Sequence, residues 1–222
     1  NISNLGAKPT LFYLSSKNNS SQIINNLINK EKKINGIQIN IKKYRTPIKT
    51  RYKNKLKHII RIDNEINDFK LNKKDKEFIL FKLSKEIKKH DLVVLSDYNK
   101  GMLDKVLVQQ IIDIAKKYKI EVIGDPKKVD LSTYSNISLI TPNQKELTDA
   151  AKKKNLSKKE IITFSKKINK KYNIKNILVT RSEKGMLLIN ENENIQYLAT
   201  AKTVSDVTGA GDTVIAVLAL ML

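Results

Sequence analysis

The feature that most constrains this fold is an alternation of short apolar runs with longer segments of helical periodicity. Apolar runs of five or six residues are typical of strands buried on both faces of a sheet. The longer segments, such as KKDKEFILFKLSKEIKKH and LDKVLVQQIIDIAKKYK, have the spacing of amphipathic helices. The apolar runs are LFYLS (11–15), DLVVLS (91–96), IEVIGD (120–125), ISLIT (137–141) and NILVT (176–180). This order predicts an α/β fold with a mostly parallel sheet and helices on both of its faces.

Segment 37–65 differs from the rest of the chain, because polar and apolar residues alternate along it without helical periodicity. A period of two is typical of strands with one exposed face. We therefore expect a small antiparallel β flap or lid in this segment. The chain has 222 residues and no internal repeat, and this length suits one domain with a sizeable core. We expect residues 1–222 to form one domain that carries the flap.

Composition argues against several classes of site. The chain has no Cys, which removes disulfides and thiolate metal sites and is compatible with a reducing compartment. Its two histidines, His58 and His90, lie far apart in the sequence, so we expect no His-based metal site. No signal-peptide pattern opens the chain, and no apolar run reaches the ~18 residues of a membrane span. We expect a cytoplasmic protein with no membrane partner.

The formal net charge of +21 invites a nucleic-acid-binding interpretation, since clustered Lys and Arg neutralise phosphates and release counterions. The lysines, however, are interleaved with Asn and Ile along the whole chain, as in KNNSSQIINNLINKEKKINGIQINIKK. A coding bias towards these three residues explains the charge without any partner. We expect no nucleic-acid partner. If the protein bound nucleic acid and the logarithm of its affinity fell linearly with the logarithm of the salt concentration, a basic binding module would be favoured instead.

Polar residues follow four of the predicted strands, at the point where each strand ends. In an open parallel sheet, ligands bind at the edge that the carboxyl ends of the strands form. Four polar sets on one edge predict an active site better than any one set alone. The residues are Asp97 and Lys100 after VVLS, Asp125 and Lys127 after EVIG, Asn143 and Glu146 after SLIT, and Thr180 and Arg181 after NILV.

Each set also has a purely structural interpretation. Asp125 precedes a proline and fits an ordinary turn, because proline favours an extended residue before it. Asn143 and Glu146 fit a helix cap with its capping-box partner. They equally fit a pair on one helix face that holds water around a magnesium ion carrying nucleotide phosphates. Thr180 and Arg181 fit the simple end of a strand.

The tetrapeptide formed by Gly209, Ala210, Gly211 and Asp212 precedes the apolar helical run TVIAVLALML. Glycines let backbone N–H groups turn towards a ligand without a Cβ in the way. The helix N-terminus adds positive potential, so the turn suits an anion. A carboxylate there is electrostatically unfavourable unless it acts chemically, for example by taking a proton from a hydroxyl that attacks phosphorus. The alternative is a glycine turn with Asp212 as a helix cap.

Several motifs together resemble a known family. DVTGAGDT resembles the signature of the ribokinase and phosphofructokinase-B family of sugar kinases, and TPNQKE resembles its Asn-x-x-Glu motif. VVLSDYNKG, GDPK, LVTRSEKGM, NISNLGA and TPIKTRYKNKLKHIIRIDNE resemble, more narrowly, the kinase domain of bifunctional heptose-7-phosphate kinase/heptose-1-phosphate adenylyltransferases. The resemblance runs from Asn1 to Leu222 and implies a ribokinase-like α/β fold.

The resemblance also implies a role for each motif, with ATP and Mg²⁺ as cofactors. It implies that Asp212 is the general base. The anion hole for the transferred phosphoryl group would be the backbone of Gly209, Ala210 and Gly211. Glu146 would hold Mg²⁺ through water. The ATP-binding residues would be Asn143, Gln144, Lys145, Glu146, Thr180 and Arg181.

The substrate that the resemblance implies is D-glycero-β-D-manno-heptose 7-phosphate, phosphorylated at O1 on the route to ADP-heptose for lipopolysaccharide. Alternation along IKTRYK predicts Lys49, Arg51 and Lys53 on one face of the flap, suited to a distal phosphate, although a general lysine excess explains them equally. We expect the following residues near the substrate or its phosphates: Asp97, Lys100, Asp125, Lys127, Arg51 and Arg61. The alternatives are another sugar kinase, for ribose or fructose 1-phosphate, and an inactive remnant.

The sequence departs from the family pattern at Lys128, where we would expect a glycine after DPK, and this change is expected to alter the turn. Family members also carry a glycine-rich sugar-binding motif before the position of Asn1. They carry adenine-pocket helices after the position of Leu222. We therefore expect the chain to be part of a longer kinase, truncated at both ends, that acts on a sugar phosphate and ATP as a homodimer.

Overall fold

The computed structural model of the chain describes residues 1–54, 57–66, 69–200 and 209–222. The side chains of Lys53 and His58, and residues 206–208 of the DVTGAGDT motif, lie outside the described part. The chain divides into two compact units. The larger unit contains Asn1, Leu80–Asn99 and Leu103–Leu222, and the smaller unit contains Ile2–Ile79 and Lys100–Met102.

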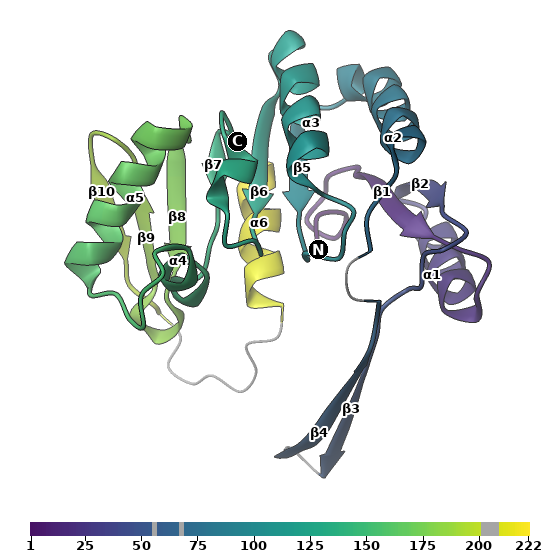
Figure 1. The fold of residues 1–222 in the computed structure, drawn as a ribbon, viewed down its shortest axis with the longest axis horizontal. Helices are drawn as coiled ribbons and strands as arrows, with labels where there is room; N and C mark the ends of the chain where they lie inside the picture. The colour runs from purple at the N-terminus through teal and green to yellow at the C-terminus, as the bar shows by residue number, and fades with distance from the viewer. Residues whose placement is uncertain (55–56, 67–68, 201–208) are drawn as a thin grey trace. The chain divides into compact units, whose positions relative to one another are not determined.

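In the described part of the larger unit, six strands form one sheet (Figure 1). The strands are β5 (Leu92–Ser96), β6 (Glu121–Asp125), β7 (Leu139–Ile140), β8 (Asn176–Thr180), β9 (Met186–Ile189) and β10 (Asn194–Tyr197). Their order across the sheet is β10-β9-β8-β7-β6-β5. β5 to β8 run parallel to one another, whereas β9 and β10 pair antiparallel with their neighbours.

Helices cover both faces of this sheet (Figure 1). On one face Ile215 of α6 (Ala210–Met221) packs against Ile123 and Leu139. The next residue is Gly124, and a Cβ built on it would lie 3.7 Å from the ring of Tyr134 in the short 3-10 helix η2 (Leu131–Tyr134). Because successive strand residues point to opposite faces, α6 and η2 lie on opposite sides of the sheet. Other helices of this unit are α3 (Lys105–Lys117), α4 (Gln144–Ala150), α5 (Lys158–Tyr172) and η3 (Ser182–Lys184).

Side-chain caps explain where the helices of this unit begin. Asp104 accepts a hydrogen bond from the N–H of Leu107 at 2.9 Å and starts α3. A capping box of Ser157 and Glu160 starts α5. Each cap satisfies a backbone N–H that has no partner within its helix. α5 ends at Asn173, whose φ of 51° is a left-handed conformation that asparagine tolerates.

The smaller unit contains, in its described part, a parallel strand pair and an antiparallel hairpin. β1 (Thr10–Ser15) and β2 (Asn35–Asn40) run parallel and are joined by α1 (Asn19–Lys30). β3 (Ile48–Asn54) and β4 (Lys57–Asn64) form the hairpin. α2 (Lys73–Glu86) begins in this unit and continues into the larger one, where η1 (Ile87–Lys89) follows it.

The architecture confirms the predicted α/β fold with a mostly parallel sheet, and the five predicted strands appear as β1, β5, β6, β7 and β8. β9 and β10 are additions that the sequence pattern did not predict. All four residues of β10 are exposed, so this edge strand lacks an apolar signature and is defined by its pairing with β9.

The predicted flap of residues 37–65 is only partly a hairpin. Residues 37–40 belong to β2 and pair with β1, and Ile39 is buried there opposite Leu14. The antiparallel part is β3 and β4. The register of this hairpin shifts between Tyr52 and Lys53, and such a bulge interrupts strand alternation. Lys49 and Arg51 pair in regular register with Asp63 and Arg61, and the predicted side-chain position of Lys53 lies outside the described residues.

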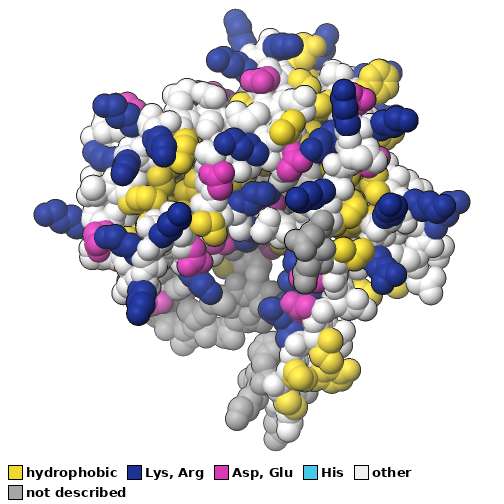
Figure 2. Space-filling model, viewed as in Figure 1, with side chains coloured by type: hydrophobic (Ala, Val, Ile, Leu, Met, Phe, Trp, Pro, Cys, Tyr) yellow, Lys and Arg dark blue, Asp and Glu magenta, His cyan; other side chains and the backbone are white. Residues whose placement is uncertain are grey.

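Lysine and arginine side chains are scattered over the face of the molecule shown in Figure 2, with acidic side chains between them. This distribution supports a general excess of lysine on that face rather than a single basic stripe. Within the described ranges, no helix combines the length and apolar character that crossing a membrane would require.

Candidate active site

Asp97 directly follows β5 and is only 3% exposed. The hydroxyl of Tyr134 and the amine of Lys128 each donate to its Oδ2 at 2.5 Å, and the N–H of Asn99 donates to Oδ1 at 2.7 Å. Lys128 also donates to the carbonyl of Leu103. A buried carboxylate is costly unless it is paired and hydrogen-bonded. Lys128, the position that departs from the family pattern, is the cation that neutralises Asp97.

Lys127 links two carboxylates at this edge of the sheet. Its Nζ lies 3.2 Å from Asp125 Oδ2 and 2.8 Å from Glu146 Oε1. Asp125, the last residue of β6, is 5% exposed, and the hydroxyl of Thr141 lies 3.4 Å from its Oδ1. One cation therefore faces two acids in a partly enclosed site.

Burial and neighbouring charges shift the pKa values of Asp125 and Lys127. Burial raises the pKa of Asp125; the cation of Lys127 opposes this, and the charges of Glu146 and Asp212 add to it, so that the pKa is raised overall. For Lys127, burial lowers the pKa, but the hydrogen bond to Glu146 and the charge of Asp125 outweigh burial and leave the pKa raised. Lys127 is consequently held in its charged form.

Asn143 and Glu146 form the start of α4. The N–H of Glu146 donates to Asn143 Oδ1 at 2.8 Å, and the N–H of Asn143 donates to Glu146 Oε2 at 2.8 Å, which is a capping box. The helix-cap interpretation of this pair is thus correct. Glu146 Oε1 still pairs with Lys127, so the same side chain both caps the helix and contributes to the charged cluster.

The end of β8 lies beside this cap. The N–H of Thr180 donates to the carbonyl of Pro142 at 3.0 Å, and Asn143 and Thr180 form a parallel bridge. Arg181 is buried, and its Nε donates to Gln144 Oε1 at 3.1 Å. Arg181 is therefore an oriented positive charge next to the start of α4.

The glycine turn forms the start of α6. Gly209 has φ 81°, a left-handed conformation that favours glycine, and it is the N-cap residue. A Cβ built at Gly209 or at Gly211 would meet no described atom within 4 Å, so packing does not require either glycine. The first N–H groups of a helix have no partner within it, and this end carries positive potential. The turn is therefore suited to bind an anion.

Asp212 lies in the first turn of α6, and Tyr98 orients its carboxylate. The hydroxyl of Tyr98 donates to Asp212 Oδ1 at 2.8 Å. Burial, and then the hydrogen bond and charge of Asp212, raise the pKa of Tyr98. The phenol therefore keeps its proton and remains a donor to Asp212 at neutral pH.

The structure brings most of the predicted site residues together at the carboxyl edge of the sheet. The N–H of Asp97 donates to the carbonyl of Asp125 at 3.2 Å, which joins the ends of β5 and β6. The residues gathered in the larger unit are Asp97, Asp125, Lys127, Asn143, Gln144, Glu146, Thr180, Arg181, Gly209, Ala210, Gly211 and Asp212. Lys145, in the first turn of α4, is exposed.

Three predicted residues lie in the smaller unit: Lys100, Arg51 and Arg61. The amine of Lys100 lies 2.5 Å from Glu65. Arg51 pairs across the hairpin with Arg61, whose Nε lies 3.0 Å from Asp63. The amine of Lys49 lies 3.9 Å from the same aspartate.

Three further side chains of the site lie outside the predicted set: Tyr98, Lys128 and Tyr134. The position of Tyr98 inside SDYNKG, next to Asp97, is a signal that could have identified it. No local pattern links Tyr134 with Asp97, since 37 positions separate them. Lys128 stands out in the sequence only as a departure from a motif, and its pairing with Asp97 needs the fold.

Among the described residues, no three or more His, Cys, Asp and Glu side chains are grouped so that they could hold a metal ion.

A parallel sheet whose carboxyl edge carries an anion-binding helix start beside an oriented carboxylate is suited to phosphoryl transfer to a hydroxyl. The family model described as pfkB family carbohydrate kinase matches residues 1–222. The chain belongs to the pfkB family of carbohydrate kinases, which confirms the predicted family and class of enzyme.

Among curated proteins, the chain is similar to bifunctional proteins named HldE. The chain is 42% identical over 177 residues to the bifunctional protein HldE of Helicobacter pylori (strain J99), a match that covers 80% of the chain and 38% of that protein. It is 37% identical over 223 residues to HldE of Haemophilus influenzae (strain PittEE), covering 100% of the chain and 45% of the relative. The chain thus spans less than half the length of these curated relatives.

Solved structures confirm the ribokinase-like fold. A mutant of phosphofructokinase-2 from Escherichia coli superposes with a TM-score of 0.80 at 19% identity, over 99% of this chain and 71% of the other. Ribokinase from Giardia lamblia superposes with a TM-score of 0.73 at 16% identity, over 95% of this chain and 66% of the other.

Proposed function

We propose that residues 1–222 belong to one kinase domain that transfers the γ-phosphoryl group of ATP to O1 of D-glycero-β-D-manno-heptose 7-phosphate. The product is the 1,7-bisphosphate, on the route to ADP-heptose and lipopolysaccharide in the cytoplasm. Likeness to the HldE proteins supports this acceptor. The observation that carries the proposal is the carboxylate of Asp212, which Tyr98 holds at the glycine-rich start of α6.

In this mechanism Asp212 takes the proton from O1 as that oxygen attacks phosphorus. The O1–P bond forms, the bond from phosphorus to the β,γ-bridging oxygen breaks, and ADP leaves with that electron pair. The N–H groups of Gly209, Ala210 and Gly211 bind the transferred group where negative charge develops. A positioned general base contributes a factor of ~10²–10⁴ to the rate.

The nucleotide would bind along the edge formed by β8 and the start of α4. Arg181, oriented by Gln144, supplies a fixed positive charge for phosphates, and exposed Lys145 supplies a mobile one. The other residues proposed to bind ATP are Asn143, Glu146 and Thr180. Mg²⁺ carried by the phosphates would be held through water by Glu146 and would neutralise phosphate charge.

The sugar phosphate needs contacts at both ends, because binding energy from the non-reacting end positions the reacting one. Near Asp212 we place Asp97, Asp125 and Lys127 as contacts of the substrate or its phosphates. For the distal phosphate we propose cations of the smaller unit. These are Lys49, Arg51, Lys53 and Arg61 of the hairpin, together with Lys100.

A coupled assay of ADP release on the full-length protein tests the substrate. We expect the heptose 7-phosphate to have a higher kcat/KM than ribose or fructose 1-phosphate. A higher value for either of the other sugars would disprove the heptose assignment and leave a different sugar kinase. Release of no ADP with any sugar, from protein that retains its circular dichroism spectrum, would identify an inactive member of the family.

We further propose that the protein is a homodimer. On one face of the hairpin Tyr52 pairs with Ile60, and Ile62 pairs with Thr50. The large apolar side chains of this face, Tyr52, Ile60 and Ile62, are exposed. A two-stranded ribbon is marginally stable unless such a face is covered. Sedimentation equilibrium should give a dimer for the parent and a monomer for the Tyr52→Ser/Ile60→Ser variant. Lys49→Ser, on the charged face, should remain dimeric; a dimeric double variant would place the interface elsewhere.

A further inference from the structure

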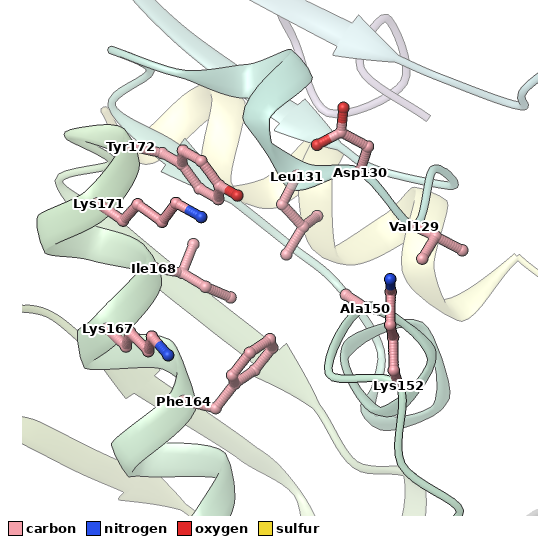
Figure 3. Close-up of a pocket in the computed structure, with 10 residues that line it drawn as sticks. All are labelled: Val129, Asp130, Leu131, Ala150, Lys152, Phe164, Lys167, Ile168, Lys171 and Tyr172. Atoms are coloured by element: carbon pink, nitrogen blue, oxygen red, sulfur yellow. The ribbon is translucent and has the colours of Figure 1, made fainter.

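A pocket of about 500 Å³ in the larger unit lies between η2, the end of α4 and α5 (Figure 3). Its volume falls within the ~300–1,000 Å³ typical of small-molecule sites. The described residues that line it include none of those proposed above for catalysis, nucleotide binding or sugar binding. The pocket is therefore a second concave site on the same unit.

The wall of the pocket is apolar and partly aromatic. Phe164, Ile168 and Tyr172 are spaced four residues apart on α5, so they share one face of the helix. Figure 3 shows this face opposite Leu131 of η2. Apolar side chains in a concave site bind the body of an organic molecule, and the two rings favour stacking against an aromatic one.

Positive charge borders this apolar wall. Lys167 and Lys171 of α5 and Lys152, which follows α4, are among the residues that line the pocket (Figure 3). The amine of Lys171 also lies 5.1 Å from the centre of the Tyr172 ring. The three lysines are exposed, so their amines can pair with an acidic group at the rim of the pocket while the body of the ligand lies against the apolar wall.

Asp130, the one acid among the described residues that line the pocket, is already engaged. The N–H of Ser132 donates to its Oδ1 at 3.0 Å. A hydrogen bond from the side chain of Ser132 lowers the pKa of Asp130, and the charges of Lys105 and Lys171 lower it further. In Figure 3 its carboxylate points away from the other lining side chains. The ligand-facing charge of the pocket is accordingly positive.

We propose that this pocket binds an aromatic small molecule that carries one acidic group, a carboxylate, sulfonate or phosphate. The ring lies between the α5 face and η2, where it contacts Phe164 and Ile168. The acidic group pairs with Lys152 and Lys167, at the mouth of the pocket.

Fluorescence titration with 8-anilinonaphthalene-1-sulfonate, an aromatic sulfonate, tests this proposal on the full-length protein. We expect saturable binding of one probe molecule, and a Kd at least tenfold higher in the Lys152→Glu/Lys167→Glu variant. The matched control is Lys154→Glu/Lys170→Glu, which makes the same charge change at exposed positions outside the pocket. The control should bind the probe with a Kd within about twofold of the parent.

Three results would overturn the proposal: no saturable binding to the parent, an unchanged Kd in the pocket variant, or equal weakening in the control. The last result would mean that net charge, rather than the pocket, attracts the probe. Circular dichroism and thermal melting verify that each variant is folded. If the pocket double variant does not fold, Lys167→Met replaces it, and the same comparison is made against Lys170→Met.

Discussion

Two helices of the larger unit begin in the same way, but only one of them starts at the candidate site. α4 begins with a capping box of Asn143 and Glu146, and α5 begins with a capping box of Ser157 and Glu160. In both boxes the glutamate uses one oxygen for the backbone of the cap residue. The local geometry of these two helix starts is the same, because both follow the same spacing rule.

The two glutamates, Glu146 and Glu160, differ in their surroundings. Glu146 pairs with Lys127 at 2.8 Å, and that lysine also contacts the buried Asp125. Glu160 pairs with Lys153 at 2.7 Å, where the side chains are 45% and 53% exposed. Charges in the enclosed cluster act on one another and on a ligand, whereas water screens the exposed pair. The same motif therefore places one glutamate in the charged cluster at the carboxyl edge of the sheet and the other in an exposed ion pair.

The largest effect on the reaction rate is expected from replacing Asp212, the acid at the start of α6. Asp212→Asn should lower kcat by ~10² or more, because the general base is lost, while ATP binding stays nearly unchanged. Steady-state ADP release and equilibrium ATP binding measure the two quantities. Asp149→Asn, at an exposed position near the other end of α4, is the control and should retain the parent kcat. A kcat of Asp212→Asn within a few-fold of the parent would remove Asp212 from that role.

The next largest effect is on the free energy of unfolding, and it compares the lysines that pair with the two glutamates, Lys127 and Lys153. Lys127→Met leaves two acids at the edge without their shared cation, and it should lower the free energy of unfolding by about 2 kcal/mol. This is less than the ~3–5 kcal/mol for breaking a fully buried pair, since the Lys127 side chain is 34% exposed. Lys153→Met breaks a surface pair and should cost less than about 1 kcal/mol. Urea denaturation followed by circular dichroism measures both, and equal losses would contradict the proposed difference in environment.

A smaller effect is expected from replacing each glutamate with glutamine, which can still complete a capping box. Glu146→Gln should raise the magnesium concentration for half-maximal rate by about tenfold, the scale of change when a group that orients a metal's ligands is lost. Glu160→Gln should leave this concentration unchanged. Magnesium titrations of the ADP-release rate make the comparison. If both variants need the same magnesium concentration as the parent, Glu146 caps α4 and pairs with Lys127 but does not hold magnesium.

The smallest effect is the pH dependence of the exposed cap. The hydrogen bond with Lys153, followed by those with Ser157, lowers the pKa of Glu160 to about 2, from an ordinary value of 4.5. An acid whose pKa is lowered on folding stabilises the native state above its unfolded pKa, and this stabilisation is lost as pH falls to the folded pKa. The difference in melting temperature between the parent and Glu160→Gln should therefore be greatest above pH 4.5 and vanish near pH 2. A constant difference would exclude this linkage.

Asp125 should show the opposite sign, since its pKa is raised on folding. Its ionised form is the less favourable one in the folded protein, so stability falls as pH rises from the unfolded pKa through the raised folded pKa. Asp125→Asn should remove this fall from the pH profile of the melting temperature. A profile that keeps the same slope would show that Asp125 is not its source.

Local chemistry in the sequence was enough to predict five of the strands and the helical segments between them, to give the cap at Asn143 as one of two interpretations, and to predict the glycine turn before Asp212. A cap joins residues three positions apart, and a left-handed turn depends on the residue that adopts it, so both are readable from a short stretch. The alternation of apolar runs likewise reports which segments have two buried faces. These features predicted an α/β sheet and the carboxyl edge at which the site residues meet.

Only the tertiary structure decided how the buried charges are paired. Asp97 meets Lys128 and Tyr134 across 31 and 37 positions of the chain, and Asp212 meets Tyr98 across 114. Burial makes such pairing necessary, because a carboxylate that leaves water must regain its hydrogen bonds and a compensating charge. Which residues provide them depends on how the strand ends and α6 pack together, and that information is distributed over the whole unit rather than held in any one motif.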